Sequence, residues 1–174
     1  MSGPRALPRA SMGSERRTLG LARAIGTLTR LSGAAMGLLL AVLLAIAFAE
    51  VVMRYLLGSG WPWGGTVSVI VLLFLAWIGA GHLWLTGGHI AVTLMGARAQ
   101  VLLARVFGLA VIGGGLVLLP MTLDTMEAYS FIDLPALGIS ASVKYLPVAF
   151  GTGYLVCAAC LVLAADLVDG RARR

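Results

Sequence analysis

The amino-acid sequence predicts an all-α integral membrane protein with four transmembrane helices. Of its 174 residues, 60% are hydrophobic and only 11% are charged, and the mean hydropathy is +0.98. A soluble domain carries roughly 25% charged residues. The chain is also short, so we expect a single small membrane domain with no soluble enzyme domain beside it.

Four apolar runs are long enough to cross a bilayer, which takes about 20 helical residues. They are Leu31–Val52, Thr66–Leu85, Val106–Leu123 and Tyr145–Leu167. An open sheet would leave backbone polar groups unpaired in lipid, and the runs lack the alternation of barrel strands. Each run is therefore predicted to be an α-helix.

The distribution of basic residues predicts that the N- and C-termini both lie in the cytoplasm, because Lys and Arg in short loops are retained on that side. Basic residues gather before the first run, between the second and third, and after the fourth: Arg5, Arg9, Arg16, Arg17, Arg23, Arg30, Arg98, Arg105, Arg171, Arg173 and Arg174. The connection from Asp124 to Lys144 instead carries three acidic residues and one Lys. We expect this connection, and the one after the first run, to face outward.

The chain divides into a basic leader (residues 1–30), a four-helix membrane domain (31–168) and a basic tail (169–174). The first run is too long for a cleaved signal peptide and is predicted to be an uncleaved anchor. Within the leader, Ser14–Arg30 fits either a short amphipathic helix or a disordered segment. The helix would turn Leu19, Ala22, Ile25 and Leu28 toward lipid. Topology explains the net charge of +6, so nucleic-acid binding is not predicted.

Glu50 and Arg54 are four residues apart near the end of the first run. On a helix, this spacing places both side chains on one face, so we predict an ion pair that neutralises them near the membrane boundary. An alternative interpretation makes Glu50 the proton-coupling acid of an autonomous four-helix multidrug exporter. In those exporters the acid is unpaired and near mid-membrane, which does not fit the position of Glu50.

The histidines and cysteines do not predict a cofactor or metal site. His82 and His89 would share one helix face, which does not supply ligands on opposite sides of a haem. We predict that His82 forms a hydrogen bond between helices and that His89 lies just past the end of its span. Cys157 and Cys160 lie inside an apolar run, where we expect buried, unreactive thiols.

Glycines recur within the runs, where they would let helix backbones approach closely. They are Gly33, Gly37, Gly79, Gly81, Gly113, Gly114, Gly115, Gly151 and Gly153. These positions predict packing surfaces within the bundle or against another membrane protein.

No nucleophile with its base and no pair of catalytic carboxylates is visible, so the chain is not predicted to be an enzyme. Because the spans hold few polar groups, a subunit is favoured over a self-sufficient carrier.

Two blocks of sequence carry a family resemblance. The first block comprises Val51-Val52-Met53-Arg54-Tyr55-Leu56, then Trp63, then Gly79, then Gly87-Gly88-His89-Ile90-Ala91-Val92. The second comprises Pro135-Ala136-Leu137-Gly138-Ile139-Ser140, then Tyr145-Leu146-Pro147-Val148-Ala149-Phe150-Gly151. In order and spacing, they resemble the small membrane subunit of tripartite ATP-independent periplasmic (TRAP) transporters, the DctQ-like family, over about residues 30–168.

The resemblance implies a scaffold for a large TRAP permease subunit in the bacterial or archaeal cytoplasmic (inner) membrane, in contact with membrane lipids. In such an importer, an extracytoplasmic substrate-binding protein captures an organic anion, such as a carboxylate. The large subunit then carries it across by secondary active transport, using a sodium or proton gradient. The segments Leu56–Trp63 and Asp124–Lys144 would offer part of the docking surface for the binding protein. Residues expected at subunit contacts or in assembly are Glu50, Arg54, Tyr55, Trp63, Gly79, His89, Tyr145 and Pro147.

The chain departs from the family pattern at three places, which suggests a divergent branch. Gly64-Gly65-Thr66 stands where one or two acidic residues usually follow the Trp. Thr93 stands in place of a common Asp, and Ser142 in place of a common Trp. Two alternatives stay open beside the TRAP subunit: the exporter, and a structural subunit of another membrane complex.

Overall fold

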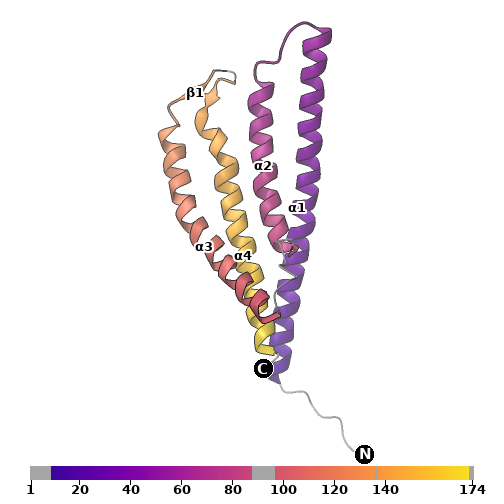
Figure 1. Ribbon diagram of the computed structural model, residues 1–174, viewed down its shortest axis with the longest axis vertical. Coiled ribbons are helices and arrows are strands. Elements are labelled where there is room, and N and C mark those ends of the chain that lie inside the picture. The colour runs from indigo at the N-terminus through magenta and orange to yellow at the C-terminus, as the bar shows by residue number, and fades with distance from the viewer. Residues whose placement is uncertain (1–8, 88–96, 136, 173–174) are drawn as a thin grey trace, which may run out of the picture.

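The computed structural model describes residues 9–87, 97–135 and 137–172, which form four long helices and a small hairpin (Figure 1). The long helices are α1 (Arg9–Leu56), α2 (Gly64–Leu85), α3 (Ala97–Ala128) and α4 (Leu146–Ala172). Strands β1 (Asp133–Leu134) and β2 (Ile139–Ser140) pair antiparallel, and the 3-10 helix η1 (Ala141–Tyr145) leads into α4. The predicted helical class is confirmed.

The four predicted spans correspond to the four long helices. The stretches long and apolar enough to cross a membrane are Gly20–Leu56, Gly64–Leu85, Leu102–Ala128 and Ala141–Val168. All four are longer than the predicted apolar runs, because a helix can continue beyond the hydrocarbon into the polar head-group region. With 48 residues, α1 is about 70 Å long, whereas the hydrocarbon core is roughly 30 Å thick.

The helices lie side by side in the order α1, α2, α4, α3 (Figure 1). Helix α4 is central, because it packs against α1, α2 and α3. Helix α1 begins and α4 ends at the same end of the bundle, here termed the termini end. The α1–α2 connection and the β1–β2 hairpin lie at the opposite end, here termed the hairpin end.

The basic leader is helical from Arg9 onward and continues directly into the first span. The described part is therefore neither a disordered segment nor a separate short helix. Ile25 and Leu28 are half-buried, as is Leu21, and they share a helix side with buried Ser32. This side of α1 is turned toward the bundle, so the expectation that Ile25 and Leu28 face lipid was wrong.

Close approach of α2, α3 and α4 depends on three glycines that each face a side chain of a neighbouring helix. Gly81 faces Tyr154, Gly115 faces Val156 and Gly151 faces Trp77. A Cβ atom at any of these glycines would overlap the facing side chain. These three pairs are termed the packed seam. Beside it, Ala158 and Ala159 are fully buried, so the predicted role of small residues in packing is confirmed here.

Large hydrophobic side chains cover the outside of the bundle. Leu38 and Phe48 on α1, Leu72 on α2 and Leu109 on α3 are all exposed. A soluble monomer rarely exposes such extensive apolar surface. This surface suits lipid or another membrane protein.

Candidate subunit interface

At the hairpin end, Glu50 and Arg54 form the predicted ion pair. Arg54 Nη2 lies 2.9 Å from Glu50 Oε1, one turn apart on α1. Glu50 is the less exposed partner, and its Oε2 would lie 3.7 Å from a Cβ atom on buried Gly64, the first residue of α2. Negative charge is favourable at a helix N-terminus. The pair therefore links the end of α1 to the start of α2, with Tyr55 exposed beside it.

Trp63 directly precedes α2 and packs against Trp61, with ring centroids 4.2 Å apart. Its carbonyl oxygen accepts a hydrogen bond from the backbone N–H of Val67 at 3.0 Å. The first turn of α2 contains no acidic residue, because it is formed by Gly64, Gly65, Thr66 and Val67. The nearby Glu50 carboxylate therefore brings negative charge to this turn from a different helix.

The connection between α3 and α4 contains a hairpin that the sequence analysis did not predict. Asp133 pairs with Ser140, and Leu134 pairs with Ile139. Gly138 has a φ of +63°, which glycine adopts without steric cost. Leu134 is buried beneath the turn, whereas Phe131 just before it is 90% exposed. The hairpin end thus presents an ordered surface with an apolar side chain standing out from it.

Tyr145 and Pro147 hold the start of α4 in place. The Tyr145 ring lies 5.3 Å from the ring of Tyr129, which directly follows α3. Pro147 is fully buried in the first turn of α4, where its missing N–H breaks no helical hydrogen bond. Both residues have clear contacts or burial within the chain, and their contact with another subunit stays a prediction.

His82 joins α2 to α1, as predicted. Its Nδ1 lies 2.8 Å from Ser32 Oγ, and the same hydroxyl lies 3.1 Å from the carbonyl oxygen of Thr29. The helices meet closely here, because a Cβ atom on Gly33 would lie 3.5 Å from the His82 ring. His89, the other predicted histidine, lies outside the described residues, as does Thr93.

The predicted contact residue Gly79 faces α1 within the chain. A Cβ atom there would lie 3.5 Å from Met36 Cε, which is an ordinary van der Waals distance. Gly79 therefore contributes to α1–α2 packing, and a role in contact with another subunit stays a prediction.

A second set of glycines points away from the rest of the chain. A Cβ atom on any of these would have no neighbour within 4 Å: Gly37, Gly113, Gly114 and Gly153. Two of them, Gly113 and Gly114, lie on α3 beside the exposed side chains of Leu109, Leu116 and Val117. These five residues are termed the open face of α3. Glycine in such a face lets another membrane helix approach closely.

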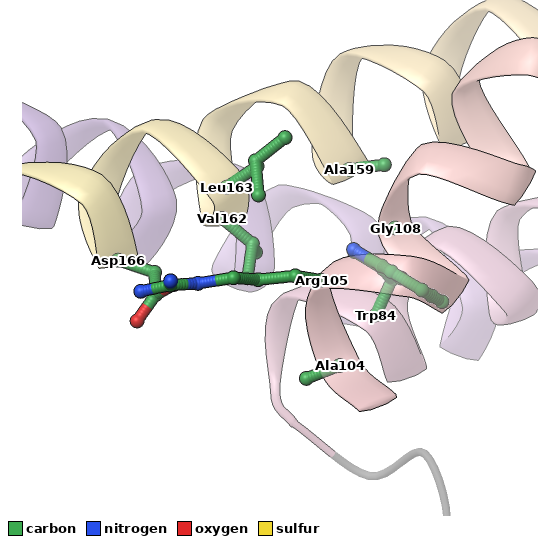
Figure 2. A pocket seen from close by; sticks show the side chains of 8 residues that line it. All are labelled: Trp84, Ala104, Arg105, Gly108, Ala159, Val162, Leu163 and Asp166. Carbon is green, nitrogen blue, oxygen red and sulfur yellow. The ribbon is translucent and has the colours of Figure 1, made fainter. Parts of the chain in front are cut away.

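Arg105 and Asp166 form an ion pair that the sequence analysis missed. Arg105 Nε donates a hydrogen bond to Asp166 Oδ2 at 2.7 Å, joining α3 to α4 near the termini end (Figure 2). The sequence did contain a signal for this ion pair. In a four-span chain, the start of the third span and the end of the fourth lie on the same side of the membrane, so opposite charges at those positions can pair.

Cys157 and Cys160 are free and exposed, so the prediction of buried thiols was wrong. They lie on one side of α4, whereas the intervening Ala158 and Ala159 are the buried residues.

Among the residues that the structure describes, no group of three or more His, Cys, Asp or Glu side chains could hold a metal ion. The described residues therefore form surfaces for helix packing and ion pairs between charged side chains, as expected of a membrane protein that contacts other subunits.

Residues 43–172 match the family model described as tripartite ATP-independent periplasmic transporters, DctQ component. The chain belongs to the DctQ family. It is the small membrane component of a TRAP transporter and not an enzyme. No curated protein matches the chain.

The family match confirms the resemblance carried by the two sequence blocks. It extends from Leu43 in the last third of α1, through the three connections between the long helices, to the last residue of α4. All eight predicted contact residues of the DctQ component, as well as Arg105 and Asp166, lie inside it. The autonomous exporter is set aside, because DctQ is one component of a three-part transporter.

Proposed function

We propose that this DctQ component scaffolds a large permease subunit in the cytoplasmic (inner) membrane, and that the large subunit imports an organic anion such as a carboxylate. The family implies a large membrane subunit and a periplasmic binding protein as partners. The observation that carries the scaffold role is the open face of α3. Helix α3 lies at the edge of the bundle. Because Gly113 and Gly114 have no side chains and no neighbour within 4 Å of a Cβ position, another helix can pack closely against this surface.

The charges of the chain support transport by the partner rather than by this subunit. Glu50 lies near the end of its span and is paired with Arg54. Asp166 lies in the last turn of its span and is paired with Arg105. A carrier of ions or protons uses ionisable groups inside the membrane. Neither of these carboxylates has that position, so we assign substrate and ion coupling to the large subunit.

Affinity purification from the native membrane tests the scaffold role. The full-length chain carries a tag and is extracted in mild detergent, and mass spectrometry identifies what accompanies it. We expect a large, many-span membrane protein in stable association. Purification of this chain as a homodimer alone, from membranes that contain the large subunit, would contradict the proposal.

We also propose that the termini end faces the cytoplasm and that the hairpin end receives the binding protein. The basic residues before α1 and after α4 support this orientation. Exposed Leu56 and Phe131 belong to the two connections expected to form the docking surface. Both connections lie at the hairpin end.

Thiol labelling tests the orientation. In a chain with Cys157→Ala and Cys160→Ala, we expect Ser59→Cys at the hairpin end to react with a membrane-impermeant reagent in intact spheroplasts. The matched variant Ala22→Cys, exposed on α1 toward the termini end, should react only after the membrane is opened. The reverse labelling pattern would invert the orientation.

A further inference from the structure

Near the termini end, a hollow between α3 and α4 combines an ion pair with an apolar wall (Figure 2). The residues that line it are Trp84, Ala104, Arg105, Gly108, Ala159, Val162, Leu163 and Asp166. Arg105 and Asp166 extend toward one another from facing helices, and the Trp84 side chain comes in from α2 (Figure 2). The hollow therefore offers two opposite charges at one edge and hydrocarbon surface beyond them.

The ion pair leaves much of its hydrogen-bonding capacity unused. Arg105 Nε donates to Asp166 Oδ2, and within the described part of the chain this is the only hydrogen bond of either side chain. A guanidinium has five N–H donors and a carboxylate has two acceptor oxygens. Both Nη nitrogens of Arg105 and Oδ1 of Asp166 thus remain available. With side chains 40% and 41% exposed, the pair is open to a ligand.

The candidate spans place the hollow where hydrocarbon would give way to lipid head groups. Arg105 is in the first turn of the candidate span Leu102–Ala128, and Asp166 is in the last turn of Ala141–Val168. Trp84 is in the last turn of α2. Trp and Arg both favour this boundary. A ligand that reaches the charges and the apolar wall together needs a polar head group and an acyl chain.

We propose that this hollow binds one molecule of phosphatidylethanolamine. Its phosphate accepts hydrogen bonds from the Arg105 Nη nitrogens, its ammonium donates to Asp166 Oδ1, and an acyl chain lies against the half-buried side chains of Val162 and Leu163. Charge-assisted hydrogen bonds of this kind are short and strong. Gly108 forms the floor of the hollow against the Trp84 ring, because a Cβ atom there would lie 3.6 Å from that ring.

Charge complementarity favours this head group over the other common ones. Phosphatidylglycerol has a phosphate for Arg105 but no cation for Asp166, so its negative charge would approach the carboxylate uncompensated. Phosphatidylcholine has a cation, but its quaternary nitrogen carries no N–H donor. Only an amine-bearing zwitterion satisfies both Arg105 and Asp166. Lipid binding at the hollow does not depend on the transporter function proposed above.

Native mass spectrometry of the full-length chain in mild detergent tests the lipid site. The chain is mixed with equal amounts of phosphatidylethanolamine, phosphatidylcholine and phosphatidylglycerol that have identical acyl chains. We expect one phosphatidylethanolamine to be retained in preference to the others. Arg105→Gln and Asp166→Asn should each weaken its binding by about tenfold or more, and Gly108→Leu, which fills the hollow, should also reduce it.

The other ion pair supplies the matched control. The double variant Glu50→Gln and Arg54→Gln removes an ion pair of the same type at the hairpin end, and should leave phosphatidylethanolamine binding unchanged. Equal retention of the three lipids by the unaltered chain would overturn the proposal, whether or not any variant folds.

Discussion

The packed seam and the open face of α3 use the same residue type in opposite environments. Gly114 and Gly115 are neighbours on α3, yet a Cβ atom on Gly115 would overlap Val156, whereas one on Gly114 would have no neighbour within 4 Å. Successive helical residues point in directions about 100° apart, so one glycine faces α4 and the other faces away. A run of glycines therefore marks where helices can approach, and the fold determines whether the approaching helix belongs to the same chain.

The largest effect should come from adding a single methyl group to the packed seam. Gly151→Ala places a Cβ atom against Cβ and Cγ of Trp77, which are close to the backbone and cannot swing aside. Overpacking of this kind costs about 1–3 kcal/mol. We expect a clearly lower midpoint of unfolding in a detergent and SDS titration followed by circular dichroism.

Gly153→Ala is the matched control for this variant. It lies on the same helix, two residues further along, and its Cβ atom would meet nothing within 4 Å. Ala favours a helix over Gly by about 1 kcal/mol, so stability should be unchanged or slightly higher. Equal destabilisation by both variants would show that the seam and the open positions do not differ.

The open face of α3 should respond in the opposite way. Gly113→Leu introduces a bulky side chain where the chain itself has no neighbour, so the isolated subunit should unfold as the unaltered one does. A partner helix packed on this face would be pushed away, and the amount of large subunit that copurifies should fall severalfold. Quantitative mass spectrometry of the purified complex measures this ratio.

Gly37→Leu on α1 is the matched control, since it is another open glycine but lies on a helix that does not contact α3 closely. We expect it to leave the amount of bound large subunit unchanged. Undiminished copurification with Gly113→Leu would mean that α3 faces lipid and that another surface binds the partner.

The sequence predicted features that depend on local spacing or on the length of an apolar run. The four spans follow from run length, because only a helix satisfies its backbone in lipid. The Glu50–Arg54 pair follows from four-residue spacing. For His82, a polar side chain in an apolar helix predicted a hydrogen bond to another helix, although the sequence did not identify Ser32 as its partner.

Features that depend on how helices rotate and pack were not predictable in the same way. The division of the glycines into the packed seam and the open positions depends on where α4 lies relative to α2 and α3. The exposure of Cys157 and Cys160 has the same cause, because hydropathy does not distinguish a lipid-facing side of α4 from a protein-facing one. The pairing of Arg105 with Asp166 required matching two distant span ends.

The smallest effect is expected where α1 meets α2 at the hairpin end. Arg54→Ala leaves the Glu50 carboxylate unpaired beside buried Gly64, so we expect a modest reduction in the yield of assembled complex on size-exclusion chromatography. Glu50→Gln combined with Arg54→Gln removes both charges and should restore part of that yield. Exposed ion pairs contribute little by themselves, so recovery in the double variant would identify the cause as an uncompensated carboxylate. An unaltered yield with Arg54→Ala would mean that this junction, unlike the packed seam, tolerates the change.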